Sequence, residues 1–207
     1  MLGLSLFSGI GGLDLAAEWA GIEPVAFSEI DPFCQSILKK HWPHVPIFDD
    51  VRNIRGDQFG DIDIVYGGFP CQDVSLAGKR TGFSNSDRQV TRSGLWGEMH
   101  RIIRETQPRW VVVENVRGLL SIPSWDGRRG GGFGDVLRDL SELGYRVGWC
   151  CYGAYDVGAV HKRERVFIVA YSSSLRFKRR SSKSKKDANW VGKVEPYNIS
   201  LHLQHLH

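Results

Sequence analysis

Short apolar runs rich in β-branched residues alternate with helix-like stretches along most of this 207-residue chain. Such alternation is typical of a doubly wound α/β fold with a parallel sheet and helices on both faces. A chain of this length suits one domain with a substantial core. The runs predicted as strands are residues 2–7, 24–30, 45–51, 61–68, 109–116, 145–153 and 165–171, and the predicted helices are 13–20, 32–40, 95–106 and 132–143.

Chemically distinctive residues follow the predicted strands repeatedly, at the point where each strand ends. In doubly wound sheets, ligands bind at the carboxyl ends of the strands. We therefore expect one functional edge of the sheet. The residues placed there are Ser8 to Gly12, Glu29, Asp50, Pro70, Cys71, Glu114 and Asn115.

A glycine turn, "FSGIGG", follows the first strand and leaves backbone N–H groups open near a helix N-terminus. Glu29 ends the second strand, where a carboxylate can accept hydrogen bonds from ribose hydroxyls, although the turn is not GxGxxG. Asp50 ends the third strand and suits an adenine amino group. Singly, each acid is more often a helix cap or a surface charge. Together they favour an adenosine-containing cofactor.

A single thiol, Cys71, follows the fourth strand in "GGFPCQDVSLAGKR". A thiolate is a strong nucleophile, and nearby cations lower its pKa. The alternative is a buried structural thiol. Pro70 before it and the polar stretch 70–93, predicted as a long loop, argue against simple core filling, because loops this long are usually functional or disordered.

Polar residues end the later strands as well. Glu114 ends an apolar strand, where a carboxyl can have a raised pKa and serve as an acid, or else form a cap or a surface salt bridge. Arg163 and Arg165 alternate in "HKRERVFIVA", so a strand would point both to one face. Two guanidinium groups in one cleft suggest anion or carbonyl recognition. The alternative is an exposed strand edge.

Several classes of protein are disfavoured by the sequence. The four cysteines form no CxxC pair and have no histidine at ligand spacing, so neither a metal site nor a disulfide framework is expected. No apolar run reaches the roughly 20 residues needed to span a bilayer. The N-terminus lacks the basic start of a secretion signal, so we expect a cytoplasmic protein without membrane contact.

Four blocks of the sequence together resemble the DNA (cytosine-5)-methyltransferase family: "LFSGIGGLDLA", "GGFPCQDVSLAGKR", "ENVRGLL" and "HKRERVFIVA". They match in order over residues 2 to about 171. The resemblance implies a Rossmann-like, S-adenosylmethionine-dependent methyltransferase that acts on double-stranded DNA. It also implies a cofactor pocket lined by Phe7, Ser8, Gly9, Ile10, Gly11, Gly12, Glu29, Ile30, Asp50, Val51, Pro70 and Leu95.

The same resemblance implies the catalytic groups. Cys71 would add to C6 of a cytosine flipped out of the duplex, while Glu114, Arg163 and Arg165 hold the base. The loop from Gln72 to Arg92 would close over it. The residues expected to contact DNA are Gln72, Ser75, Lys79 and Arg80, the last two through phosphates.

The C-terminal end departs from the family, in which a target-recognition region and a closing block follow the Arg-x-Arg strand. Only about 36 residues follow Tyr171, and no closing block is found in them. We expect a catalytic and cofactor-binding domain over residues 1–174 and a basic, poorly ordered tail over 175–207, with recognition supplied by a second chain or a missing part. Residues 176–207 carry eight Lys and Arg against two Asp and Glu, which suits either phosphate binding or a solvated end.

Three other functions remain open. The chain could be a non-catalytic remnant that only binds cofactor or DNA. It could methylate RNA cytosine, although the Cys-Phe-Thr triplet usual in tRNA-directed relatives is absent from the sequence. A nicotinamide dehydrogenase fits the glycine turn but leaves Cys71, Glu114 and the two arginines without a role.

Overall fold

The computed structural model describes residues 1–70, 85–122 and 131–172, with the backbone alone for 85–94. These residues all belong to one compact unit, Met1–Arg176. The predictions for Cys71, for the DNA-contacting residues (Gln72, Ser75, Lys79 and Arg80) and for the tail over 175–207 lie outside the described residues.

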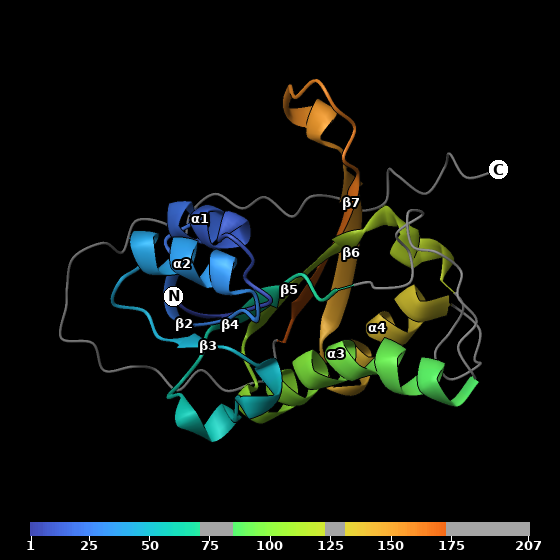
Figure 1. Ribbon diagram of the computed structural model, residues 1–207. Coiled ribbons are helices and arrows are strands. Elements are labelled where there is room, and N and C mark those ends of the chain that lie inside the picture. Colours follow the sequence, from blue (N-terminus) through green and yellow to red (C-terminus); the bar gives the residue numbers. More distant parts are fainter. Residues whose placement is uncertain (71–84, 123–130, 173–207) are drawn as a thin grey trace. The chain divides into compact units, whose positions relative to one another are not determined.

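One sheet in the order β3-β2-β1-β4-β5-β7-β6 forms the centre of the described part of the chain (Figure 1). The chain order reverses between β1 and β4, so the predicted doubly wound α/β class is confirmed. The strands are β1 (Leu2–Leu6), β2 (Glu23–Ser28), β3 (Ile47–Phe48), β4 (Ile64–Gly67), β5 (Trp110–Val116), β6 (Arg146–Tyr152) and β7 (Arg165–Tyr171).

The sheet is mixed: the predicted parallel pairing is confirmed for β1 to β5 and is wrong for β7. Strand β7 runs antiparallel to both of its neighbours, β5 and β6. The connection from β6 to β7, residues 153–164, contains a four-residue 3-10 helix (Ala154–Val157) and no α-helix of the kind that usually forms a parallel crossover. The third strand is also shorter than the predicted 45–51, since only Ile47 and Phe48 pair with β2.

Four α-helices are described: α1 (Gly12–Trp19), α2 (Pro32–His41), α3 (Asn85–Thr106) and α4 (Gly131–Glu142). In Figure 1, α1 and α2 lie on one side of the sheet, and α3 and α4 lie on the other. The predicted start of α2 is confirmed: the Asp31 carboxylate accepts from the N–H groups of Phe33 and Cys34, and Pro32 occupies the first turn. The short 3-10 helices are η1 (Val51–Asn53), η2 (Gly56–Gln58), η3 (Arg117–Ser121) and η4 (Ala154–Val157).

Helix α3 begins at Asn85, ten residues before its predicted start at Leu95. Residues 85–93 were predicted as part of a loop, and this prediction is wrong. The sequence pattern misled because apolar residues at helical spacing begin only with Trp96, which is followed by Met99 and Ile103 in the core. The polar start of the helix therefore carries no periodic signal.

The main core fills the space between the sheet and the helices α3 and α4, and it includes Leu6, Val65 and Val113. A smaller cluster under α1 contains Ala17, Ile22, Ile64 and Tyr66. Alternate residues of β5 (Val111, Val113 and Asn115) are buried, and Asn115 is the polar member of that series. A buried amide needs hydrogen-bond partners, so it points to a specific contact.

Candidate active site

The predicted cofactor turn, Phe7–Gly12, connects β1 to α1 in a strained backbone conformation. Phe7 has a φ of 55°, which is uncommon for a residue other than glycine. At Gly9 and Gly12 no atom lies within 4 Å of the position that a Cβ would occupy. At Gly11 a Cβ would lie 2.6 Å from the Trp42 ring. The turn is thus open on its outer side and closely packed on its inner side.

The predicted ribose ligand, Glu29, makes hydrogen bonds that shape this turn. Its Oε2 accepts from the Gly9 N–H at 2.7 Å, and its Oε1 accepts from the Asp31 N–H at 2.8 Å. The carboxylate therefore connects the loop after β2 to the glycine turn after β1. Each carboxylate oxygen has a second acceptor site, so Glu29 retains capacity for a ligand hydroxyl.

The second predicted acid, Asp50, caps a 3-10 helix, which is the alternative foreseen for an isolated acid. It accepts from the Arg52 N–H at 2.9 Å and forms an ion pair with the Arg52 guanidinium at 2.6 Å. Hydrogen bonds from Arg52 lower the pKa of Asp50. The side chain is 24% exposed, so the carboxylate stays accessible from solvent.

The remaining predicted cofactor residues lie along one edge of the sheet. Ile10 and Ile30 follow β1 and β2 and are 59% and 73% exposed. Pro70 follows β4 and is exposed, whereas Val51 is buried. Leu95, in α3, is half-buried and packs against the main core. The turns after four neighbouring strands therefore bring apolar and acidic groups to the same edge.

Glu114 and Arg165, two of the three residues predicted to hold the cytosine, lie together in an ion pair, and a salt bridge was also the alternative for Glu114. The Arg165 Nε lies 2.7 Å from the Glu114 Oε1, with both side chains about one-quarter exposed. Gly68 leaves room for the carboxylate, because a Cβ there would lie 2.7 Å from Glu114 Oε2. Three elements, β5, β7 and the turn after β4, thus meet at one acidic group.

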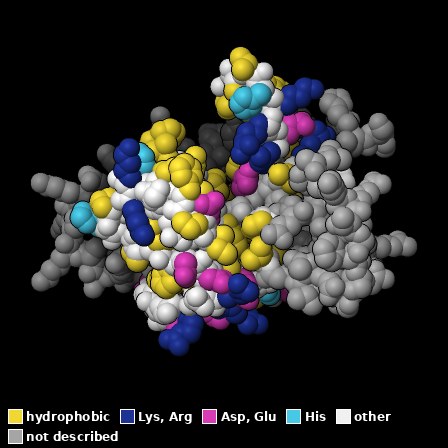
Figure 2. Space-filling view, viewed as in Figure 1, with side chains coloured by type: hydrophobic (Ala, Val, Ile, Leu, Met, Phe, Trp, Pro, Cys, Tyr) yellow, Lys and Arg dark blue, Asp and Glu magenta, His cyan; other side chains and the backbone are white. Residues whose placement is uncertain are grey.

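Arg163 does not lie in a strand, so the prediction that it shares a strand face with Arg165 is wrong. Strand β7 begins at Arg165, and Arg163 is exposed with a φ of 30°. The intervening Glu164 pairs with Arg117 at 2.7 Å. Arg163 lies in the 153–164 connection, which projects beyond the sheet in Figure 1. His, Lys and Arg side chains gather there in Figure 2.

Asn115 is a site residue to which sequence reasoning gave no role. It is 3% exposed, and its Nδ2 donates to the Phe69 carbonyl at 3.0 Å. Its Oδ1 accepts from the Val116 N–H at 2.8 Å. The amide holds the backbone in place two residues before Cys71. The sequence did hold one indication of this role, because Asn115 is a polar residue next to Glu114 at the end of an apolar strand.

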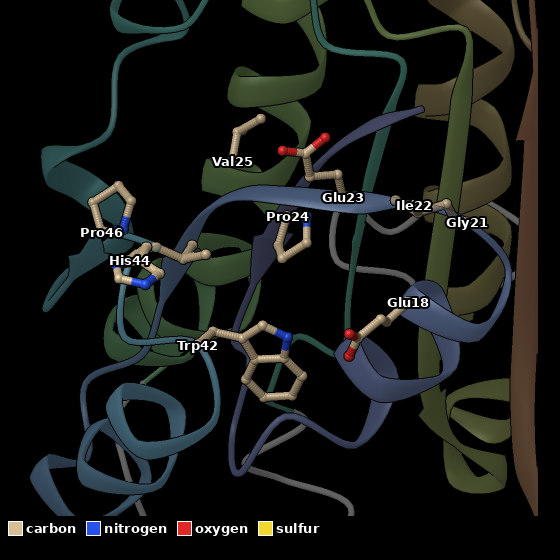
Figure 3. A pocket seen from close by; sticks show the side chains of 10 residues that line it. Glu18, Gly21, Ile22, Glu23, Pro24, Val25, Trp42, His44 and Pro46 are labelled. Carbon is tan, nitrogen blue, oxygen red and sulfur yellow. The ribbon is translucent and has the colours of Figure 1, made fainter. Parts of the chain in front are cut away.

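A cavity of about 530 Å³ lies elsewhere, beside the first residues of β2 (Figure 3). It is lined by residues that include Glu18, Pro24, Trp42 and His44. Glu23 begins β2 and Glu29 follows its end, so most of this cavity lies toward the opposite edge of the sheet from the cofactor turn, although its lining residue Trp42 also packs against the turn at Gly11. It therefore does not belong to the predicted cofactor site.

Within residues 1–70, 85–122 and 131–172, no cluster of three or more His, Cys, Asp or Glu side chains is arranged to hold a metal ion. Among the same residues, no helix is both long and apolar enough to cross a membrane.

Residues 1–202 match the family model described as C-5 cytosine-specific DNA methylase. The chain belongs to this family. It is 36% identical over 171 residues to the type II methyltransferase M2.BsuMI of Bacillus subtilis, covering 81% of this chain and 41% of that protein. It is also 36% identical to the type II methyltransferase M.NgoBI of Neisseria gonorrhoeae, covering 84% of this chain and 51% of the relative.

Solved structures agree with this family assignment. A protein of E. coli, described as a DNA modification methyltransferase encoded within a prophage, superposes with a TM-score of 0.64 at 27% identity, covering 84% of this chain and 47% of that one. Spodoptera frugiperda DNMT2 shares the fold with a TM-score of 0.64 at 22% identity, covering 90% of this chain and 56% of its own. The fold is that of S-adenosylmethionine-dependent methyltransferases. The chain spans about half the length of the curated relatives it matches.

Proposed function

We propose that this chain carries the catalytic part of a DNA (cytosine-5)-methyltransferase, which transfers a methyl group from S-adenosylmethionine to C5 of cytosine. The observation that carries the proposal is the Glu114–Arg165 ion pair beside Gly68, three residues before Cys71. Family membership supports the reaction class. The full reaction on DNA needs target recognition, which we assign to a part of the protein outside this chain or to a second chain.

The turn after β1 suits an adenosine-containing cofactor. Gly9 and Gly12 present backbone without side chains to the outer side, where a ligand can approach closely. Glu29 holds the turn and keeps free acceptor sites for ribose hydroxyls. Asp50 and the exposed Ile30 flank the same edge. When bound there, S-adenosylmethionine supplies an electrophilic methyl group.

Cys71 is the proposed nucleophile. Its thiolate adds to C6 of cytosine, forming a C6–S bond and making C5 electron-rich enough to accept the methyl group. Loss of the C5 proton to a base then lets the C6–S bond break and restores the aromatic ring. Burial raises the pKa of the half-buried Cys34 and Cys150 thiols, which lowers the fraction of each that is present as thiolate.

Glu114, protonated or sharing a proton, is the proposed hydrogen-bond donor to N3 of the cytosine ring, where negative charge builds up as the thiolate adds to C6. Arg165 orients the Glu114 carboxylate and offers further N–H donors for the O2 carbonyl. Arg163 is exposed on the connection 153–164, and we propose that it contacts the DNA backbone next to the target cytosine. Because a paired base cannot reach the thiol, the target must flip out of the duplex. Lys79 and Arg80, with Gln72 and Ser75, are the proposed DNA contacts on the segment after Cys71.

The test is methyl transfer from labelled cofactor to mixed-sequence DNA, with and without an added recognition region from a relative. DNA containing 5-fluorocytosine should trap the protein covalently, because fluorine does not leave as a proton does. Cys71→Ser should abolish both trapping and transfer while cofactor affinity, measured by calorimetry, stays nearly unchanged. Cys151→Ser is the matched control, since it removes an exposed thiol on β6.

The outcomes separate the candidate functions. Comparable turnover by Cys71→Ser would refute the covalent mechanism. Cofactor binding without transfer under every condition would favour a non-catalytic protein. Transfer to RNA alone would identify a different substrate.

A further inference from the structure

A buried carboxyl group, Asp14, lies behind the cofactor turn and is not used by the proposed chemistry. It belongs to the first turn of α1, two residues after Gly12, and its side chain is fully buried. The Tyr66 hydroxyl donates to Asp14 Oδ1 at 3.0 Å. The other oxygen, Oδ2, has no hydrogen-bond partner among the described residues.

This carboxyl group is not needed to fill the core. The neighbouring buried residues of α1 and the sheet are mostly apolar, including Ala17, Ile22 and Ile64. An apolar side chain at position 14 would pack there without the cost of removing a carboxyl group from water. Burial raises the pKa of Asp14, while the hydrogen bond from the Tyr66 hydroxyl acts in the opposite direction. The polar group is thus retained despite its burial.

The Tyr66 hydroxyl that bonds Asp14 comes from β4, at the level of Ser5 in the adjacent strand β1. Ser5 of β1 and Tyr66 of β4 are paired in the sheet register. One residue after this pair, the strands reach Leu6 and Gly67 and then separate into the cofactor turn and the segment that leads to Cys71. Ser5 also contacts the turn directly, because its Oγ lies 2.8 Å from the Ser8 Oγ.

We propose that Asp14 is a positioning residue: from the first turn of α1, directly after the cofactor turn, it holds this turn and the strand leading to Cys71 at a fixed separation through its hydrogen bond with Tyr66. The proposal rests on the proposed function. In that function the methyl group of a cofactor bound at the turn after β1 must meet a cytosine activated by Cys71, which follows β4. A misplacement of about 1 Å between reacting groups can lower a rate about a hundredfold. The Asp14–Tyr66 hydrogen bond lies one residue before β1 and β4 reach Leu6 and Gly67 and separate, so it is well placed to prevent such a misplacement.

The variants are Asp14→Asn, which keeps the volume but loses the charge and one acceptor oxygen, and Tyr66→Phe, which loses only the donor. The matched control is Tyr145→Phe. Tyr145 is also buried, and its hydroxyl donates to the Pro108 carbonyl at 2.6 Å, at a place away from the cofactor turn. It therefore reports the general cost of removing a buried tyrosine hydroxyl.

Three quantities are measured: the melting temperature, the affinity for S-adenosylhomocysteine by calorimetry, and the rate at which iodoacetamide alkylates Cys71 with and without that ligand. Alkylation is followed on the Cys71 peptide by mass spectrometry. In the wild type, saturating ligand should slow alkylation at least about threefold, because ligand on the turn fixes the neighbouring segment. In Asp14→Asn and Tyr66→Phe this ligand effect should largely disappear, and ligand affinity should fall about tenfold. Tyr145→Phe should lower the melting temperature alone.

Other results would overturn the proposal. If ligand slows Cys71 alkylation in both variants as much as in the wild type, Asp14 contributes only to packing. The proposed function would still stand in that case. If bound ligand does not change the rate of Cys71 alkylation in the wild type, the cofactor turn and the segment that carries Cys71 are not coupled. If Asp14→Asn fails to fold, Tyr66→Phe decides the question. Failure of the wild type to bind the ligand would refute the proposed function itself, before any variant is compared.

Discussion

The Asn115 side chain donates its Nδ2–H to the carbonyl of Phe69 at 3.0 Å, which joins the end of β5 to the turn after β4. Asn115→Ala removes this contact from a site that is almost fully buried. Losing a buried hydrogen bond costs about 1–3 kcal/mol, which corresponds to roughly 2–12 °C in melting temperature for a chain of this size. We also expect methyl transfer to be lost, since the backbone before Cys71 loses its support.

Calorimetric melting and the trapping assay check this prediction. Asn53→Ala, at an exposed position, is the control and should change neither measurement. Full activity of Asn115→Ala at a lowered melting temperature would show that Asn115 matters for stability alone.

Gly68→Ala should impair the Glu114 site with little loss of stability. The added methyl group would lie 2.7 Å from Glu114 Oε2, so the carboxylate must move away from its present position beside Arg165. Trapping of 5-fluorocytosine DNA should fall at least about tenfold, as expected for the loss of one hydrogen bond to a charged group. Gly148→Ala is the control, because nothing lies within 4 Å of the added atom. Equal trapping by both variants would remove Glu114 from base recognition.

Glu29→Ala and Asp50→Ala should both weaken binding of S-adenosylmethionine. A charge-assisted hydrogen bond contributes about 1.5–3 kcal/mol, so the affinity should fall roughly ten- to a hundredfold. The two variants differ in stability, since Glu29 also holds the Gly9 and Asp31 N–H groups whereas Asp50 bonds Arg52. Titration calorimetry measures the affinities, and unchanged binding in both variants would remove these acids from the cofactor site.

The sequence predicted the framework of the site better than its contacts. The strands that position Glu29 and Glu114, β2 and β5, were found because a buried strand needs an apolar run, and such a run is visible in one sequence. The start of α2 was found because Asp31 and Pro32 act locally. Local chemistry of this kind needs no knowledge of distant residues.

Contacts between distant segments could not be predicted in this way. The role of Asn115 depends on Phe69, 46 residues away, and the role of Gly68 depends on Glu114. The antiparallel pairing with β6 sets the direction of β7. It begins at Arg165, which pairs with Tyr152, so Arg163 lies outside the strand. These features arise from tertiary pairing, for which no periodic signal exists in the sequence.

The pH dependence of stability should include a contribution from Glu105. A hydrogen bond from the Gly56 N–H at 2.8 Å, aided by Arg101, lowers the pKa of Glu105 below its ordinary value of 4.5. A lowered pKa in the folded state stabilises the protein above the ordinary value, and this stabilisation is lost as pH falls through the folded pKa. Because the side chain is 33% exposed, the effect should stay below about 1 kcal/mol.

Glu105→Gln should therefore lower the melting temperature near pH 7, and its difference from the wild type should shrink well below pH 4. Thermal melting at a series of pH values checks this. Glu142→Gln, at an exposed position of α4, serves as the control. A constant difference across the whole pH range would contradict a charge effect.

The basic tail should bind duplex DNA through phosphates, separately from the cofactor site. Its eight Lys and Arg residues give a salt dependence with a logarithmic slope of up to about −7, without preference for base sequence. Strand β7 runs antiparallel, so Tyr171 pairs with Trp110, the first residue of β5. Strand β7 therefore ends at the edge of the sheet where β5 begins, whereas Glu114 lies near the other end of β5.

Cutting the chain after Ser174 tests the two roles directly. The last described contact is that of Ser172, whose buried N–H donates to the Arg109 carbonyl at 3.1 Å, and the cut preserves it. The shortened chain should keep its melting temperature and its affinity for S-adenosylmethionine, while losing most of its DNA binding at low salt. DNA binding is measured at two salt concentrations, because phosphate contacts weaken steeply between them. Loss of cofactor binding, or a large drop in melting temperature, would mean that residues beyond Ser174 belong to the cofactor-binding unit.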